Sequence, residues 1–272
     1  AASIRRGGRG VLALVLETEG STYAGVGDMV LFDEDLQVGW LSGGCLEPQL
    51  AKRSRDVCDS GEIEWVEIDT RSDDDLLAGS ALGCRGRLRI AMLPLRSLPG
   101  VDALIDAWLH AGVSLSANIG AEGGVAFDAG SQRAQWSIDT HGQDWSGDAT
   151  SWRLSLLRLP RLLILGAGPE TPTLIPLLRE LGWWVCLAER RARWNGVGSP
   201  ADACLQSAPA AALHEASVDA VLVMHHDFEL DREALDALAG TDIGFIGLLG
   251  PRRRRDDLLT LLPPNPRASL IP

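Results

Sequence analysis

The chain has 272 residues, enough for two domains of ordinary size, and its 46% apolar and 23% charged residues are a normal globular balance. The net charge of -12 argues against a nucleic-acid partner, because binding to a duplex needs a basic face. No apolar run approaches the roughly 18 residues of a membrane span, and residues 1–9 lack the apolar core of a secretory signal. We therefore expect no nucleic-acid or membrane partner and a cytoplasmic location.

The first half of the chain is predicted to contain strands and two helices. Apolar runs predict strands at residues 11–17, 62–69 and 87–95, and a hairpin with strands at 29–32 and 36–41. A helix is expected from Pro48 to about Asp59, because proline suits a first turn, and an amphipathic helix over residues 101–110. Short pieces between residues 113 and 159 predict antiparallel strands and the link between the domains.

From residue 161 onward, strands alternate with helices, which predicts a parallel sheet with right-handed crossovers. Strands are expected at residues 162–165, 183–188, 203–206, 220–224 and 243–249, and the helices between and after them end near residues 181, 238 and 262. The predicted fold class is α/β: an N-terminal α+β domain, residues 1–150, followed by a Rossmann-like doubly wound parallel-sheet domain, residues 151–272.

A glycine-rich turn follows the first strand of this second domain. Gly166 allows a tight turn, and Gly168 lets a phosphate approach the N-terminus of the next helix, where free N–H groups and the helix dipole favour an anion. Glu189 lies 21 residues beyond Gly168, where an acid usually meets ribose hydroxyls. Thr171 replaces the usual third glycine, which predicts looser packing of the helix on the strand. We favour a ligand-binding turn over a purely structural one.

Polar residues also follow the fourth and fifth strands of the predicted sheet. In a doubly wound sheet the ends of the first and fourth strands flank the ligand crevice, and the fourth ends in His225, His226 and Asp227. Because neighbours on a strand point in opposite directions, we expect one histidine to face the ligand, and favour His226 with Asp227. The alternative is that these residues cap the next helix. Arg252 follows the fifth strand and is predicted to bind phosphate ahead of the arginines after it, because a guanidinium suits that contact.

Cys45 is the candidate reactive thiol. It follows Gly43 and Gly44 at the start of a helix, where N–H groups favour the thiolate and the glycines leave room for a large ligand. A thiolate is a soft metal ligand and a nucleophile, whereas the alternative is a small buried side chain. Cys84 is the second candidate. With five cysteines and no Cys-x-x-Cys pair, we expect neither a disulfide framework nor a structural zinc site. The other three should be inert: Cys58, Cys186 and Cys204.

Several motifs, in order, resemble the xanthine dehydrogenase accessory protein family, called XdhC/CoxI. In the first half they are Gly-Ser-Thr at 20–22, residues 25–31, Ser-Gly-Gly-Cys-Leu-Glu at 42–47 and Gly-Cys at 83–84. In the second half they are Leu-Gly-Ala-Gly-Pro at 165–169, Glu-Arg-Arg at 189–191, Met-His-His-Asp at 224–227 with Asp231, and Ile-Gly-Leu-Leu-Gly-Pro-Arg-Arg at 246–253. The pairing of Ser-Gly-Gly-Cys-x-Glu with Gly-Leu-Leu-Gly-x-Arg is specific. The resemblance spans most of the chain apart from residues 101–159.

The resemblance implies an accessory factor, a chaperone and not an enzyme. Such a factor binds the molybdenum cofactor, as molybdopterin or its dinucleotide form, and assists its sulfuration by a cysteine desulfurase and its insertion into the apo-enzyme of a molybdenum hydroxylase. A homodimer is also implied. The resemblance makes Cys45 a candidate molybdenum contact, which Cys84 approaches from another loop, and it adds Glu47, Gly247 and Gly250 to the candidate cofactor-binding residues.

Two other functions fit the glycine-rich crevice. An NAD(P)-dependent oxidoreductase would use the turn and Glu189, but Thr171 departs from the dinucleotide fingerprint and the first domain shows no proton-donor group for hydride transfer. A non-catalytic nucleotide sensor would bind its ligand without molybdenum and without a partner hydroxylase. Absorbance and thermal shift with molybdopterin and with NAD would separate the three functions.

Overall fold

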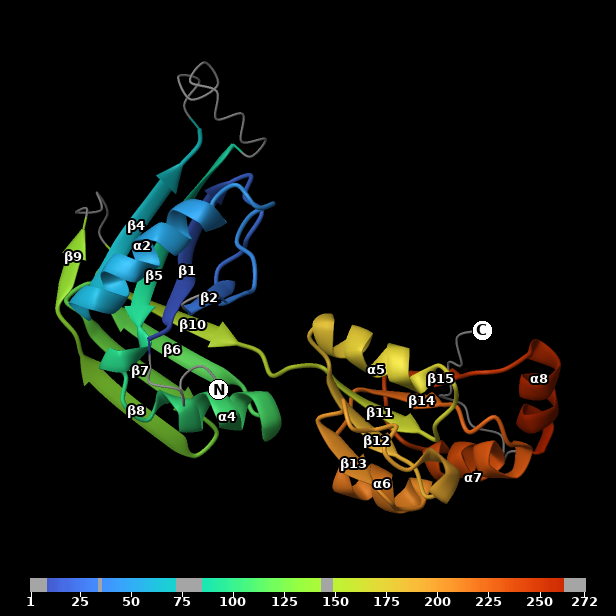
Figure 1. Cartoon of the computed structure of the whole chain (residues 1–272). Coiled ribbons are helices and arrows are strands. Elements are labelled where there is room, and N and C mark those ends of the chain that lie inside the picture. The colour runs from blue at the N-terminus through green and yellow to red at the C-terminus, as the bar shows by residue number, and fades with distance from the viewer. Residues whose placement is uncertain (1–8, 34–35, 72–84, 143–148, 262–272) are drawn as a thin grey trace. The chain divides into compact units, whose positions relative to one another are not determined.

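The structure, a computed structural model, describes residues 9–33, 36–71, 85–142 and 149–261. The chain forms two compact units, Ala1–Arg158 and Leu159–Pro272 (Figure 1). The boundary predicted between residues 150 and 151 falls too early, because strand β10 (Ser151–Leu156) pairs along its whole length with β6 (Leu115–Gly120) of the first unit.

The first unit is built on a six-stranded sheet in the order β3-β2-β1-β5-β4-β9. Its strands are β1 (Val11–Gly20), β2 (Met29–Asp33), β3 (Leu36–Val38), β4 (Ile63–Asp69), β5 (Gly86–Pro94) and β9 (Thr140–Gly142). Neighbouring strands are antiparallel, except that β9 runs parallel to β4. The central strand β1 pairs with β5 along its length, with an irregularity between Val15 and Glu17. This pairing confirms the α+β class predicted for the first domain.

Two hydrophobic cores lie on opposite faces of this sheet. Helix α2 (Glu47–Ser60) covers one face, and a four-stranded antiparallel sheet with helix α4 (Val101–His110) covers the other. Successive side chains of β1 alternate between the two cores, because side chains on a strand point to opposite faces. The two sets are Val11, Ala13 and Val15 beside α2, and Leu12, Leu14 and Leu16 beside the second sheet.

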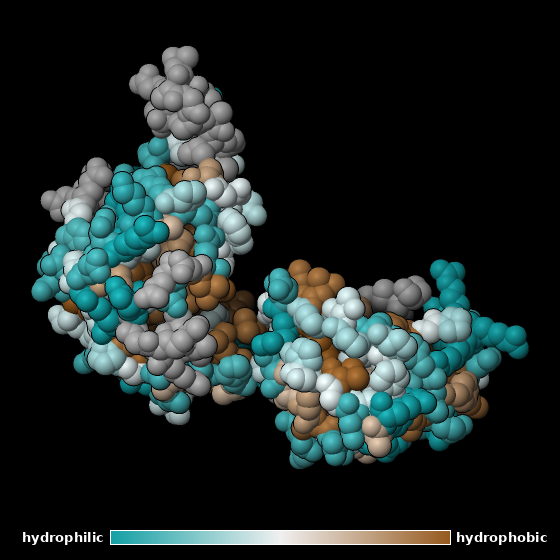
Figure 2. All heavy atoms as spheres, viewed as in Figure 1, coloured by the Kyte–Doolittle hydropathy of each residue, from teal (hydrophilic) through white to brown (hydrophobic). Residues whose placement is uncertain are grey.

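The second sheet has the order β10-β6-β7-β8, in which β7 is Gly124–Ala129 and β8 is Gln132–Ser137. Each neighbouring pair is antiparallel, as predicted for residues 113–159. A short 3-10 turn, η1 (Leu95–Ser97), links β5 to the segment before α4. Figure 2 shows that hydrophilic residues cover most of the visible face of each unit, with smaller hydrophobic patches among them.

The second unit is a five-stranded sheet in which every neighbouring pair is parallel, in the order β13-β12-β11-β14-β15. The strands are β11 (Arg161–Leu165), β12 (Trp184–Ala188), β13 (Ala203–Leu205), β14 (Ala220–Val223) and β15 (Phe245–Leu248). The first strand of the unit therefore lies between the second and the fourth, which is the Rossmann arrangement. The predicted Rossmann-like class is confirmed, and the ends of β11 and β14 meet as expected.

Helices cover both faces of the parallel sheet. Helix α5 (Thr171–Glu180) packs on one face through Ile175, against Leu162 and Ile164 of β11. Three helices pack on the other face: α6 (Pro209–Glu215), α7 (Phe228–Leu238) and α8 (Arg252–Leu261). A short 3-10 turn, η2 (Ala192–Trp194), follows β12. In the part of the chain that the structure describes, no helix has the length and apolarity needed to cross a membrane.

Among the differences from the predicted elements, one strand end and one helix have a local explanation. Strand β3 ends at Val38 and not at residue 41, because Gly39 has a φ of +96° and a β-carbon there would stand 2.5 Å from the carbonyl oxygen of Met29. Helix α6 is not among the predicted helices. Its sequence does carry a start signal, since Pro209 stands at the first turn and is followed by three alanines.

A buried arginine joins the three central strands of the first unit. Arg89 of β5 is only 4% exposed, and its guanidinium donates to Glu67 of β4 at 2.8 Å and to Glu17 of β1 at 2.9 Å. Burial alone would lower the pKa of Arg89, but the hydrogen bonds and charges of Glu67 and Glu17 raise it above its usual value. The arginine therefore stays charged between its two carboxylates.

We expect Arg89→Met to lower the free energy of unfolding by about 2–3 kcal/mol, because two charged hydrogen bonds are lost and two carboxylates lose the buried cation between them. Urea denaturation measures the change. The matched control is Arg133→Met, at an exposed pair with Asp128 whose atoms are 3.4 Å apart, where the change should stay within about 0.5 kcal/mol. Equal losses in the two variants would contradict the prediction.

Candidate functional site

Both glycines of the predicted ligand turn lie in close contact with other residues. Gly166, just after β11, has a φ of +88°, and a β-carbon there would lie 2.4 Å from Cγ of His225. A β-carbon on Gly168 would lie 2.7 Å from both Oε1 of Glu170 and Nε2 of His226. Only glycine places the loop this close to the end of β14. The loop therefore lies in contact with the polar residues that follow the fourth strand.

Side chains of the protein itself accept the hydrogen bonds of two loop amides. The N–H of Ala167 donates to Glu189 at 2.7 Å, and that of Gly168 donates to the hydroxyl of Thr171 at 2.9 Å. Thr171 is fully buried at the start of α5. The threonine hydroxyl thus accepts from a loop amide that a glycine at this position would leave free, and the looser packing of α5 on the strand stays a prediction.

Glu189 lies against the loop, as its position after β12 predicts. Its side chain is only 6% exposed. It accepts from the backbone N–H of Arg191 at 2.7 Å and from the guanidinium of the same arginine at 2.6 Å. Burial alone would raise the pKa of Glu189, but the hydrogen bonds from Arg191 and Ala167 lower it overall. Arg191 also donates to the carbonyl oxygens of Ala167 and His225, both at 2.8 Å. No role was predicted for Arg191 from the sequence; its signal is a cation two positions after the strand-end acid.

Both histidines after β14 face the glycine loop, although only one was expected to. His225 is buried, and its ring packs against Gly166. His226 has a φ of +55°, and its ring nitrogen Nε2 donates to Glu170 at 2.6 Å. The alternation of a strand does not apply here, because β14 ends at Val223 and the left-handed backbone of His226 turns its ring back over the loop.

The two aspartates near the histidines, Asp227 and Asp231, form hydrogen bonds within the protein that stabilise the second unit. Asp227 caps α7, because its side chain accepts from the N–H of Leu230 at 3.1 Å; the capping alternative thus describes this residue. Asp231 is fully buried and accepts from Nδ1 of His225 at 3.0 Å and from the guanidinium of Arg254. Asp231, on α7, therefore ties the end of β14 to α8 through two donors that come from different elements.

The remaining predicted residues of the crevice lie around β15 and the start of α8. Gly247 is buried in β15, where a β-carbon would meet Leu222 at 2.7 Å, so a packing role accounts for it. Gly250 is exposed with a φ of +153°. Arg252 is exposed at the first position of α8, whereas Arg254 points inward to Asp231. Arg252 is thus the more accessible of these two guanidinium groups.

In the first unit, Glu47 holds the loop that carries Cys45. Glu47 begins α2, is 3% exposed, and accepts from the N–H groups of Leu41 and Ser42 at 2.8 and 2.9 Å. The Ser42 hydroxyl donates to the same carboxylate and accepts from the N–H groups of Gly44 and Leu46 at 3.1 and 3.0 Å. Glu47 was predicted to bind the cofactor. Both of its carboxylate oxygens accept hydrogen bonds from the loop itself.

Cys45 itself is exposed, and the space beside it is open. Its side chain borders a small hollow between the 20–24 loop, the Cys45 loop and the start of β5. A β-carbon on Gly43 would meet no atom within 4 Å, and Gly44 has a φ of +102°. Cys84 lies outside the described residues, but Gly86, two positions later, lines the same hollow. The full lining is Ser21, Thr22, Tyr23, Leu41, Ser42, Cys45, Leu46, Ile68, Thr70, Gly86 and Leu88.

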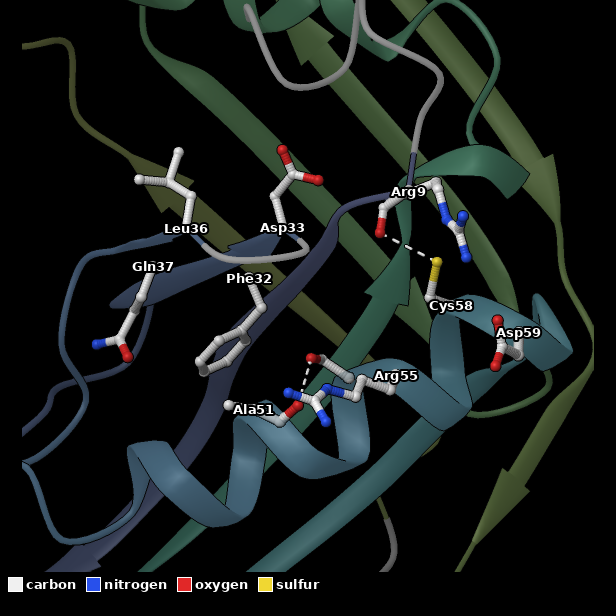
Figure 3. A pocket seen from close by; sticks show the side chains of 10 residues that line it. Arg9, Phe32, Asp33, Leu36, Gln37, Ala51, Arg55, Cys58 and Asp59 are labelled. Atoms are coloured by element: carbon white, nitrogen blue, oxygen red, sulfur yellow. Dashed lines mark hydrogen bonds between the residues drawn. The ribbon is translucent and has the colours of Figure 1, made fainter.

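A larger cavity of about 530 Å³ lies elsewhere in the first unit, between α2 and the β2–β3 hairpin (Figure 3). Arg9 and Arg55 line it together with Asp33 and Asp59, and the thiol of Cys58 donates to the carbonyl oxygen of Arg9 at 3.0 Å. None of the residues predicted to bind a ligand lines this cavity. We assign it no ligand, because it adjoins residues 1–8 and 34–35, which are not described.

Within the described ranges, no three His, Cys, Asp or Glu side chains are grouped so that they could hold a metal ion. The exposed thiol of Cys45 offers a soft ligand or nucleophile, and in the second unit His226 and Arg252 are accessible to solvent.

The clamp at Glu47 predicts a pH-dependent stability. Burial alone would raise the pKa of Glu47, but its hydrogen bonds from Ser42 and from the backbone lower it below the ordinary value of 4.5. The carboxylate thus stabilises the fold above pH 4.5, and this contribution is lost as the pH falls through the depressed pKa. We expect Glu47→Gln to be less stable than the parent in urea at pH 7, with the difference shrinking under acid conditions. Glu122→Gln, in an exposed turn, should show no such pH-dependent difference.

The two glycines of the crevice should differ in their tolerance of alanine. Gly166→Ala combines a positive φ with a close approach to the backbone of His225, at 2.7 Å, and strain alone should cost about 1–3 kcal/mol. Gly168→Ala meets the ends of two side chains, Glu170 and His226, which can rotate away. Thermal unfolding should therefore show a clear drop for the first variant and a small one for the second. Equal destabilisation would show that the close approach has been misassigned.

Comparison with known proteins places these two sites in one family. The model of the XdhC and CoxI family matches residues 3–69, and that of the XdhC Rossmann domain matches residues 162–266. The chain is 27% identical over 271 residues to a probable subunit of xanthine dehydrogenase from Bacillus subtilis (strain 168), covering 92% of this chain and 82% of that protein. It is also similar to the crystal structure of a xanthine dehydrogenase from Bacillus halodurans, with a TM-score of 0.70 and 29% identity over 94% of this chain and 82% of that one. The first match contains the Cys45 loop and the second contains the glycine crevice, so the chain belongs to the XdhC and CoxI family.

Proposed function

We propose that this chain is an accessory factor that binds the molybdenum cofactor, assists its sulfuration and inserts it into a hydroxylase of the xanthine dehydrogenase type. Family membership supports the accessory role, since the relatives bear the name of xanthine dehydrogenase or of one of its subunits. The observation that carries the finer proposal is the exposed thiol of Cys45, presented on a loop that Glu47 holds from inside.

The surroundings of Cys45 leave open surface from which a ligand that carries soft atoms can reach the thiol. The open space at Gly43 lets a ligand approach the loop backbone, and hydroxyls of Ser21 and Thr22 line the same hollow. Tyr23, 67% exposed, adds an aromatic surface at its border. The molybdenum cofactor would supply a metal centre with sulfur ligands. The chain's part is to hold that centre against the Cys45 thiolate, which is compatible with molybdenum or with accepting sulfur.

The crevice of the second unit is the proposed site for a phosphate-bearing ligand. His226 and Arg252 are accessible there, while Gly166 and Gly168 bring the backbone close. The alternative of an NAD(P)-dependent oxidoreductase uses Glu189 for ribose hydroxyls. The internal hydrogen bonds of Glu189 weigh against that alternative, because a ribose would have to replace Arg191 and the Ala167 amide.

Cys45 provides the direct test. We expect Cys45→Ala to lose at least about tenfold in affinity for the molybdenum cofactor, because one metal or sulfur contact is removed. Affinity is measured by absorbance titration. The rates of alkylation compare the reactivity of the Cys45 thiol with that of Cys58. The control is Cys58→Ala in the same unit, whose half-buried thiol bonds Arg9 and should not matter. Full cofactor binding by Cys45→Ala would leave the thiol with a structural role only.

The partners form part of the proposal: the apo-enzyme of a molybdenum hydroxylase as acceptor, a cysteine desulfurase as sulfur donor, and a second copy of this chain. Reconstitution distinguishes the accessory role from a nucleotide sensor. With desulfurase and apo-hydroxylase present, the parent chain should raise the yield of active hydroxylase, and Cys45→Ala should not.

A further inference from the structure

Glu170 lies over the glycine loop of the second unit. It immediately precedes α5, and its two carboxylate oxygens lie 2.7 and 2.8 Å from the place of a β-carbon on Gly168. Its Oε1 accepts from His226 at 2.6 Å. Both side chains remain partly exposed, at 35% for Glu170 and 39% for His226. The pair therefore lies beside Gly168, where it is accessible to solvent.

Glu170 brings a negative charge to the end of α5. Burial alone would raise the pKa of Glu170, but hydrogen bonds from His226 and from its own backbone N–H lower it overall. The carboxylate is therefore ionised at neutral pH. The N-terminal end of a helix favours an anion, and in this protein the chain supplies that anion itself.

The other groups that would receive a phosphate are also engaged by the chain. The N–H groups of Ala167 and Gly168 donate to Glu189 and Thr171, and Glu189 holds the guanidinium of Arg191. In a Rossmann turn such amides and the helix end receive the phosphate. An incoming phosphate thus meets a loop whose donors already have acceptors.

A second imidazole, that of His225, lies buried beside the loop. The side chain of His225 is only 6% exposed, and its Nδ1 donates to Asp231 at 3.0 Å. The other ring nitrogen, Nε2, forms no hydrogen bond with any residue that the structure describes.

We propose that Glu170 is a specificity-determining residue: its carboxylate occupies the position of an incoming phosphate, and only a ligand that displaces it binds. Displacement breaks the bond between Glu170 and His226 and leaves the imidazole free to donate to the phosphate. A ligand that binds through its phosphates alone has to displace the Glu170 carboxylate with no other gain. The site therefore favours ligands that also make contacts through other groups. This inference rests on the proposed binding of a phosphate-bearing ligand in the second unit.

Inorganic pyrophosphate is the probe, because it offers phosphates and no further contacts. Calorimetry on the full chain at neutral pH should show that Glu170→Gln and Glu170→Ala bind it roughly tenfold more tightly than the parent, since a like charge near the site is removed. The alanine variant is needed because a glutamine amide can still bond His226. Glu180→Gln, at the other end of α5, makes the same change in net charge and should bind as the parent does.

The double variant Glu170→Ala with His226→Ala tests the second step. Its affinity should fall back to that of the parent or below, because no imidazole takes up the phosphate; a full gain in the double variant would overturn the role of His226. The proposal for Glu170 fails if both single variants, shown by thermal unfolding to be folded, bind pyrophosphate no better than the parent or Glu180→Gln. It also fails if none of the proteins binds pyrophosphate. Cofactor binding at Cys45 is judged separately, from Cys45→Ala, so the two failures are distinguishable.

Discussion

Buried carboxylates that accept backbone N–H groups fix the loops of both units. Glu47 binds the amides of residues 41 and 42, Glu189 binds those of Ala167 and Arg191, and Asp231 binds that of His225. A carboxylate in such a position satisfies loop amides that would otherwise be buried without partners, and charge-assisted bonds of this kind are about twice as strong as neutral ones. The loops that present the candidate groups are therefore rigid without being part of a helix or a strand.

In both sites, some side chains point inward and support the loop, while another side chain on the loop is exposed. In the first unit Glu47 and Ser42 are turned inward, and the Cys45 thiol is left exposed. In the second unit Glu189 and Asp231 are turned inward, and His226 reaches the surface. Precise placement of a reactive group requires support from neighbours that are themselves fixed. The inward carboxylates supply that support, so their presence in the family motifs does not require them to touch a ligand.

The two units present different chemistry to a ligand. The first has a soft, exposed sulfur beside open backbone, and the second has imidazole and guanidinium groups around a turn with close backbone contacts. The proposed role as a cofactor carrier gives the Cys45 loop a function, whereas a dinucleotide oxidoreductase would leave that loop without one.

Local patterns in the chain were enough to predict one unit and the character of both loops, whereas the partners of the polar side chains were not predictable from them. The order of strands and helices predicted the Rossmann-like unit, and the positions of Gly166 and Gly168 predicted a tight turn with close approach, because short-range patterns and glycine geometry act within a few residues. The motifs around Cys45 and Arg252 also predicted the family. Helix α6 and the end of β3 were missed, since the first has a weak pattern and the second depends on a contact with Met29.

The hydrogen-bond partners of the polar side chains are decided by long-range packing. Glu189 is 22 residues from Ala167 in the chain, yet the two are hydrogen-bonded, and Arg191 joins them to His225. His226 turns toward the loop because its backbone is left-handed beyond the end of β14, and Asp227 turns away to cap α7. A hydrogen-bond partner is chosen by proximity in the folded chain, and that proximity comes from the packing of strands that no local pattern encodes.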